Sequence, residues 1–453
     1  MLNFFKKFKR QTALFLAMML IGSALWSPMT AKAEGNRDGL NIKAKSAILV
    51  DVKTGKILYE KNIDQMYPPA SMTKMMTEYL VQKAVHDGKI KWDTIVPISQ
   101  KASDISHNPD FSGVPLRRDF KYTVKSLYEA LAIYSSNAAA IALAELLGGG
   151  SEANFVKQMN ATAKKLGMTE TKYINSSGLD NVDLGKYIAT GGPKETNLIS
   201  ARDLAKIAYH IVKDYPEALQ VSSIPEKDFI AGPGEVVHMV NYNFMLPGFG
   251  PNMRDYKYPG VDGLKTGFTD AAGECFTGTV KQGDRRFISV VMGTDSEGAR
   301  FLETKKLYDY GFQQTKNEKI IDAGYQFKDH KTLPVAKGKA RNVGIAAKSG
   351  ITIPVEIGES KQYKPVLHLD KSVLTKDGKL KAPVKKGQKV GYITLEYKGK
   401  GEKPDFLYGD VKVPVVTTGS VDKANWFVLL FRAIGGFIGG LFSGAVDMVK
   451  GWF

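Results

Sequence analysis

A serine and a lysine three residues apart form the first pair in the chain that could do chemistry. Ser71 and Lys74 lie just after Pro68-Pro69, where a helix is predicted to begin. At positions i and i+3 of a helix, the hydroxyl and the amine share a face and come within hydrogen-bond reach. A neutral amine there can take the hydroxyl proton and turn the serine into a nucleophile. For this, burial or a neighbouring cation must lower the pKa of Lys74 from its usual value of about 10.4.

Two further sets of polar residues follow along the chain. Ser135-Ser136-Asn137 places a hydroxyl and an amide between two stretches with helical spacing of apolar residues, and Lys265-Thr266-Gly267 lies in a run that predicts a strand. Each pattern occurs a second time, at Ser420–Lys423, Ser106–Asn108 and Lys53–Gly55. The first of these copies follows no Pro-Pro pair, the second lies in a loop, and the third is typical of a turn between two strands.

The elements that must position these groups mix strands and helices. Apolar runs at residues 46–52 and 56–60 predict a hairpin around Thr54-Gly55. Further strands are expected at 261–267, 274–281 and 286–293, and helical spacing predicts helices over 72–86, 123–134, 138–147, 153–166, 200–212 and 296–310. Outer strands with helices between them predict an α+β fold over residues 34–312, an antiparallel sheet flanked by helices.

From about Gln313 the pattern changes. Short Val/Ile/Thr runs alternate with Lys-Gly, Ser-Gly and Asp-Gly pairs, which predicts a small all-β domain over residues 313–420. This region carries 21 basic and 11 acidic side chains, whereas residues 34–312 carry 34 and 33. The basic character of the chain therefore belongs to one domain. Its excess of lysine is either solvated surface or an attraction to anionic wall polymers or lipid headgroups.

The N-terminus predicts export. Residues 1–33 begin with four basic side chains, continue through an apolar stretch, and end in Ala31-Lys32-Ala33. This is the pattern of a signal peptide that is removed, and an uncleaved anchor is the alternative. We expect the mature protein to begin at Glu34 and to act outside the cytoplasm, at the outer face of the cell membrane.

The C-terminal segment, residues 421–453, predicts a membrane contact. Its longest uncharged run after Arg432, residues 433–446, has 14 residues and is too short to span a bilayer upright. On a helix, one narrow polar stripe faces a broad apolar side; the stripe consists of Arg432, Gly436, Gly439, Ser443, Asp447 and Lys450. Trp426 and Trp452 suit the headgroup layer, so we expect an amphipathic helix that anchors the protein in the membrane interface. The alternatives are a helix packed on the β domain and a tilted span.

Composition excludes several other classes of protein. An apolar fraction of 43% excludes a disordered chain. The single cysteine, Cys275, excludes a disulfide framework and a cysteine zinc cluster, and it is expected in a strand as part of the core. The six histidines have no metal-ligand spacing. We therefore expect no metal, no cofactor and no nucleic-acid partner.

The order and spacing of the three motifs indicate one class of protein. Ser-x-x-Lys, Ser-x-Asn 64 residues later and Lys-Thr-Gly another 130 residues on form the motif set of serine β-lactamases and penicillin-binding proteins. The chain resembles the low-molecular-mass penicillin-binding proteins, the D-alanyl-D-alanine carboxypeptidases of the penicillin-binding protein 5 group. The resemblance covers nearly the whole mature chain. It implies a substrate that is a peptidoglycan stem peptide ending in D-Ala-D-Ala, and inhibition by β-lactams.

The resemblance also implies catalytic roles. Ser71 would attack the carbonyl of the penultimate D-Ala, Lys74 would take its proton, and Ser135 would relay a proton to the leaving D-Ala. The implied substrate-binding residues are Asn137, Lys265, Thr266, Gly267, Phe268 and Arg300. Among these, the backbone N–H of Phe268 would form an oxyanion hole with that of Ser71, and Thr266 and Arg300 would contact the terminal carboxylate. Arg300 is otherwise a surface helix charge.

Three rival functions remain open at this stage. A class A-like β-lactamase would need a second base, yet Glu170 and Asn175 lack the expected spacing. A non-catalytic β-lactam sensor would usually be fused to transmembrane signalling segments, which the sequence does not contain. Endopeptidase or transpeptidase activity uses the same acyl-enzyme, and the choice depends on the shape of the groove.

Overall fold

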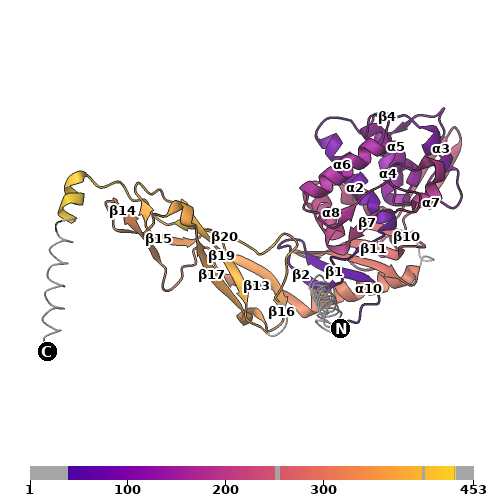
Figure 1. Cartoon of the computed structure of the whole chain (residues 1–453). Helices are drawn as coiled ribbons and strands as arrows, with labels where there is room; N and C mark the ends of the chain where they lie inside the picture. The colour runs from indigo at the N-terminus through magenta and orange to yellow at the C-terminus, as the bar shows by residue number, and fades with distance from the viewer. Residues whose placement is uncertain (1–38, 250–255, 400–402, 433, 435–453) are drawn as a thin grey trace, which may run out of the picture.

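The computed structural model describes residues 39–249, 256–399, 403–432 and 434. Within them the chain forms a rounded body of strands and helices, followed by an elongated body of strands that extends away from it (Figure 1). The predicted signal peptide, residues 1–33, lies outside the described residues, as does most of the predicted C-terminal helix.

An antiparallel sheet forms the middle of the rounded body. Its five described strands have the order β10-β11-β12-β1-β2, so the N-terminal hairpin lies beside strands from much later in the sequence. The strands are β1 (Ser46–Asp51), β2 (Ile57–Lys61), β10 (Val261–Thr269), β11 (Gly273–Gln282) and β12 (Arg285–Thr294). The predicted hairpin and the three predicted later strands are confirmed.

Helices cover both faces of this sheet (Figure 1). Successive residues of a strand point to opposite faces, so Ile48 and Val50 of β1 join a core with α2 and α8, while Ala47 and Leu49 join a core with α10. The helices are α2 (Lys74–His86), α3 (Gln100–Ser106), α4 (Val124–Tyr134), α5 (Asn137–Leu147), α6 (Glu152–Lys165), α7 (Asn181–Leu184), α8 (Ala201–Asp214), α9 (Ala218–Ser222) and α10 (Glu297–Asp309). The predicted layers are confirmed.

Short strands fasten the loops around these helices. They form three small sheets, β3-β7-β6, β4-β5 and β8-β9. The strands are β3 (Met66–Tyr67), β4 (Ile95–Val96), β5 (Tyr122–Thr123), β6 (Thr171–Lys172), β7 (Leu198–Ser200), β8 (Glu226–Gly232) and β9 (Glu235–Val240). The hairpin of β8 and β9 was not predicted from the sequence.

The elongated body is built around a separate apolar core. One sheet pairs β13 with β16, and a larger one has the order β17-β19-β20-β15-β14-β18. The strands are β13 (Thr315–Ile321), β14 (Thr332–Ala336), β15 (Asn342–Ala347), β16 (Ile351–Glu356), β17 (Tyr363–Leu369), β18 (Leu380–Lys381), β19 (Lys389–Tyr397) and β20 (Val413–Thr417). Val421 pairs with Val384, and Lys423 with Gly338, so the chain stays attached to this body up to residue 424.

The turn that carries the second Lys-Thr-Gly copy joins the two bodies. Lys56, 4% exposed, donates from Nζ to the carbonyl of Pro354 (2.7 Å) and to the hydroxyl of Tyr363 (2.6 Å). The N–H of Leu407 donates to the carbonyl of Gly55 at 2.7 Å, and Leu407 is buried in the core of the rounded body. This copy is therefore a structural turn, as predicted.

The described part of the C-terminal segment begins a helix at Trp426. Most of its large apolar side chains are exposed, including Phe427 at 52% and Phe431 at 70%. Arg432 donates to the carbonyls of Gly338 and Lys339. Among the helices that the structure describes, none is both long and apolar enough to cross a membrane.

Candidate active site

Ser71 lies in a tight turn between the sheet and α2. The turn covers Ala70–Thr73 and runs directly into α2, which begins at Lys74. Ala70 has a φ angle of 49°, a left-handed conformation that costs a residue with a side chain about 1–3 kcal/mol. The surrounding packing must hold this conformation, which fixes Ser71 just before the first residue of α2.

The Nζ atom of Lys74 has three close oxygen neighbours. It lies 2.7 Å from Ser71 Oγ, 2.7 Å from Asn137 Oδ1 and 2.8 Å from the carbonyl oxygen of Ser177. The two carbonyl oxygens can only accept hydrogen bonds, whereas the hydroxyl can also donate one. A neutral amine has two hydrogens and one lone pair, so the arrangement directs the lone pair to the hydroxyl of Ser71.

The environment favours the neutral form of this lysine. Lys74 is fully buried, and burial, with the nearby positive charge of Lys265, lowers its pKa well below the usual value, although Glu78 opposes the shift. Burial likewise lowers the pKa of Lys265. Glu78, one turn after Lys74 and 3% exposed, has a pKa that burial raises. The two lysines and Glu78 thus form one buried group of titratable side chains that influence one another electrostatically.

The Ser135-Ser136-Asn137 motif lies at the junction of α4 and α5. Ser135 ends α4 with a φ angle of 56°, and Ser136 caps α5 by accepting from the N–H of Ala139. Asn137 donates from Nδ2 to Ser112, to its carbonyl oxygen at 3.2 Å and its hydroxyl at 3.3 Å. These bonds turn the oxygen of the Asn137 amide toward Lys74.

The Lys-Thr-Gly motif lies on edge strand β10. Lys265 donates from Nζ to Ser135 Oγ at 2.9 Å. A Cβ atom at Gly267 would lie 2.7 Å from the carbonyl oxygen of Pro69 and 3.2 Å from the N–H nitrogen of Ser71. Only glycine therefore lets β10 lie this close to the serine turn, and the next residue, Phe268, lines the same cavity as Ser71.

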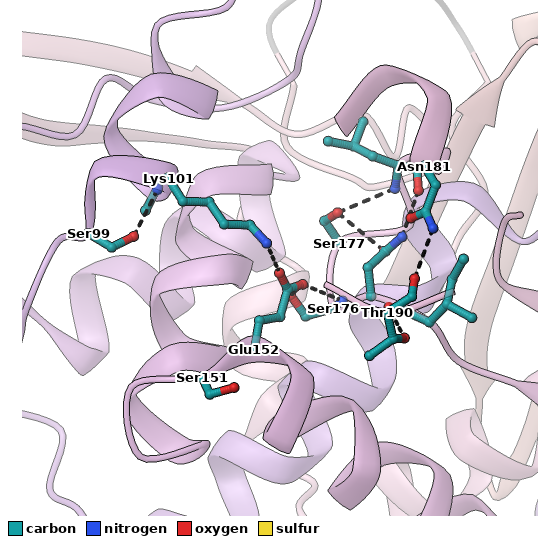
Figure 2. Close-up of polar contacts among 12 residues, drawn as sticks. Ser99, Lys101, Ser151, Glu152, Ser176, Ser177, Asn181 and Thr190 are labelled. Atoms are coloured by element: carbon teal, nitrogen blue, oxygen red, sulfur yellow. Dashed lines mark hydrogen bonds and ion pairs between the residues drawn. The ribbon is translucent and has the colours of Figure 1, made fainter. Parts of the chain in front are cut away.

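A second segment, which contains Gly178, also packs against the serine turn. Gly178 has a φ angle of 89°, and a Cβ atom there would lie 1.9 Å from the carbonyl oxygen of Ala70. The preceding Ser176 is held by Glu152 of α6, whose Oε1 accepts from its N–H at 2.8 Å and its hydroxyl at 2.6 Å (Figure 2). This anchor fixes the Ser177 carbonyl that accepts from Lys74.

Lys101 completes that anchor. Its Nζ lies 2.5 Å from Glu152 Oε2, so one carboxylate ties α3, α6 and the Ser176–Ser177 segment together (Figure 2). Glu152 is 4% exposed. A carboxylate so deeply buried requires a cation and several hydrogen bonds to remain charged.

Arg300 lies at the start of α10 and is 4% exposed. Its Nη1 forms an ion pair with Glu274 Oε2, and its Nη2 lies 3.6 Å from Glu297 Oε1. It is therefore a buried, paired cation and not a surface helix charge.

These groups surround a cavity of about 270 Å³. Its lining includes Ser71, Ser135 and Asn137, residues 266–268 of β10, and Arg300. Lys74 and Lys265 are not among the lining residues, and their Nζ atoms contact the hydroxyls of Ser71 and Ser135 respectively. The sequence-predicted residues thus come together from the serine turn, α2, the junction of α4 and α5, β10 and α10. Ser106 and Ser420 of the second motif copies lie elsewhere, bonded to Ser103 and Lys386 respectively.

Several residues of the site were not found from the sequence. Ser177 acts through its backbone, which no side-chain motif reveals, although the neighbouring glycine of Ser177-Gly178 is a signal for a special turn. Glu152 lies in the first turn of α6, where acidic residues are common, so its position gives no signal of a role in the site. Glu78 and Glu274 carry no motif. Cys275 is buried, as predicted.

Comparison with known proteins assigns the two bodies. A family model described as D-alanyl-D-alanine carboxypeptidase matches residues 29–296, and a model described as penicillin-binding protein 5, C-terminal domain, matches residues 316–423. The chain belongs to the penicillin-binding protein 5 family of serine D-Ala-D-Ala carboxypeptidases. The predicted fold and activity are confirmed, and the family binds β-lactams and acts on cell-wall peptidoglycan outside the cytoplasm.

Individual relatives agree with this assignment. The chain is 32% identical over 427 residues to D-alanyl-D-alanine carboxypeptidase DacF of Bacillus subtilis, covering 93% of this chain and 97% of that one. The crystal structure of penicillin-binding protein 5 from Haemophilus influenzae has a TM-score of 0.66 at 30% identity, covering 84% and 98%. Penicillin-binding protein D2 from Listeria monocytogenes, in its ampicillin-bound form, has a TM-score of 0.50 at 32% identity, covering 61% and 100%.

Proposed function

We propose that Ser71 performs the carboxypeptidase reaction on stem pentapeptides through an acyl-enzyme intermediate, with Lys74 as its base. The observation that carries this is the 2.7 Å contact of Ser71 Oγ with a buried Lys74 whose other two neighbours are acceptors. The hydroxyl proton passes to Nζ as Oγ bonds to the carbonyl carbon of the penultimate D-Ala. The C–N bond then breaks, and the terminal D-Ala leaves as an amine that takes a proton.

We assign that second proton transfer to Ser135. Its Oγ accepts from Lys265, and a nearby cation makes a hydroxyl a better proton donor. Ser135 regains a proton from Lys74, which carries the one taken from Ser71, so both groups return to their starting forms. Water then attacks the acyl carbon and gives a proton to Lys74, and the Ser71–acyl bond breaks as Ser71 Oγ takes that proton back. Groups of the protein itself carry out every step of this cycle, and no cofactor is assigned to it.

The backbone N–H groups of Ser71 and Phe268 are assigned to the oxyanion that forms during both steps. Thr266 and Arg300 are assigned to the terminal carboxylate of the substrate. Asn137 has a further role in this proposal, since its Oδ1 accepts a hydrogen bond from Lys74 and so orients the base.

The test is release of D-Ala from a peptide ending in D-Ala-D-Ala. Ser71→Ala should abolish release. The matched control is Ser420→Ala, which removes the serine of the second Ser-x-x-Lys copy on the exposed side of the β domain, and it should retain full activity. Release by the Ser71→Ala protein would refute the assignment of the nucleophile.

We also propose that residues 1–33 are removed on export, and that the C-terminal helix holds the enzyme at the outer face of the cell membrane. Exposed Trp426, Phe427 and Phe431 support the second part, because exposed aromatic side chains on a helix suit the membrane interface. Deletion of residues 425–453 spares the pairing of Val421 and Lys423 with the β domain. The deleted protein should keep its activity and no longer sediment with vesicles; continued sedimentation would contradict the anchor.

A further inference from the structure

Arg300 is already bound to a carboxylate of the protein itself. Glu274 pairs with Nη1, and Glu297 lies 3.6 Å from Nη2. The Nε atom of Arg300 is buried and makes no hydrogen bond with the described residues. Arg300 nevertheless lines the cavity, so a ligand carboxylate that approached its guanidinium would meet two carboxylates beside it.

The position of Glu274 places it directly at the binding cleft. It lies on β11 opposite Phe268 of β10, one residue beyond the Lys-Thr-Gly motif, and it lines the same cavity as Ser71. Its side chain is 16% exposed, compared with 4% for Arg300. The ion pair thus has a fixed, buried cation and an anion that reaches the surface beside Phe268, which is 56% exposed.

The charges that line the cavity disfavour an anionic ligand. Among the described lining residues, Asp110, Glu274 and Glu297 are acidic and Arg300 is basic. Two carboxylates forced into one site repel each other. Glu274 contacts Nη1 and Glu297 lies beside Nη2, so a ligand carboxylate competes with these carboxylates for the terminal nitrogens of Arg300.

We propose that Glu274 is a specificity-determining residue: it occupies Arg300 in the free enzyme, and the terminal carboxylate of the substrate must displace it to bind. The displaced side chain turns into solvent past Phe268. The competition raises KM for every ligand that binds through a carboxylate and leaves the chemical step at Ser71 unchanged. This inference rests on the proposed assignment of Arg300 to the substrate carboxylate.

The test compares Glu274→Gln with the wild type on two peptides that differ only at the C-terminus, one ending in D-Ala-D-Ala carboxylate and one in its amide. The amide is measured as a competitor of D-Ala release. Glu274→Gln should lower KM for the carboxylate peptide about tenfold, about 1.4 kcal/mol in binding, with kcat unchanged and no change in the inhibition constant of the amide. Glu297→Gln removes the same charge farther from Arg300 and should change KM by no more than about twofold.

Three results would overturn the inference. A higher KM in Glu274→Gln would mean that Glu274 positions Arg300 and does not compete for it. Equal changes for carboxylate and amide would mean that the effect does not pass through the carboxylate. An unchanged KM would mean that no displacement occurs. Glu274→Ser, whose side chain is too short to reach Arg300, should lower KM for the carboxylate peptide as Glu274→Gln does. Failure of the wild type to release D-Ala would instead refute the proposed function.

Discussion

Replacing Glu152 by glutamine tests how the protein holds the acceptor of Lys74. The carboxylate bonds Ser176 twice through Oε1 and Lys101 through Oε2. Glutamine keeps an oxygen for Ser176 but turns an NH₂ group toward the ammonium of Lys101. Removing one partner of a buried ion pair costs about 3–5 kcal/mol. The Lys101 side chain, 15% exposed, can turn toward solvent, so we expect the lower end of that range.

Two measurements follow from this change. A loss of about 3 kcal/mol corresponds to a fall of about 6–12 °C in Tm for a domain of this size, which circular dichroism would show. The Ser177 carbonyl should also shift away from Lys74, and one lost hydrogen bond of about 1–1.5 kcal/mol slows acylation about tenfold. The rate of labelling by a fluorescent penicillin measures this second effect.

Lys101→Met is the matched control, because it removes the cation and leaves both bonds of Glu152 to Ser176 in place. It should lower Tm but retain most of the acylation rate, and the double variant should be less than additive, since the two residues share one interaction. A Glu152→Gln protein with wild-type acylation would refute the reasoning, whatever its Tm.

Three further predictions concern the base, the turn beside Ser71 and the joint between the two bodies. The acylation rate should rise with pH through the lowered pKa of Lys74, because only the neutral amine accepts the proton; a rate that rises only near the usual lysine value of about 10.4 would contradict a buried base. Gly178→Ala should slow penicillin labelling at least tenfold by displacing the serine turn. Gly185→Ala, with a φ angle of 50° and open space around it, should cost about 1–3 kcal/mol of stability and lower Tm without slowing labelling; equal labelling rates in the two variants would contradict the close packing at Gly178. Lys56→Met should leave D-Ala release intact but loosen the two bodies, seen as a broader distance distribution by small-angle X-ray scattering; an unchanged distribution would mean that Lys56 does not hold the joint.

Local patterns sufficed for the parts of the fold that have a strong period. β1 alternates between two cores, and α2 follows Pro68-Pro69, so both could be predicted from residues close in sequence. The β8–β9 hairpin was missed although Pro233-Gly234 is a turn signal. Its strands carry charged residues on their exposed side and lack a continuous apolar run.

Some residues of the candidate site could be predicted from the sequence, and others are selected only by the tertiary fold. Side-chain motifs pointed to Ser71, Lys74 and Lys265 because acyl transfer needs those groups. The Ser177 carbonyl could not be predicted, since every residue has a carbonyl and only the tertiary fold selects one. The Glu274–Arg300 pair depends on how β11 packs against α10, a contact between elements that the sequence places apart.

The most direct test of the central claim is intact-mass spectrometry of the mature protein with benzylpenicillin, followed by peptide mapping. We expect one adduct with the mass of one drug molecule, located on Ser71 and absent from the Ser71→Ala protein. An adduct on another residue, or drug that remains intact with no adduct, would contradict Ser71 as the nucleophile.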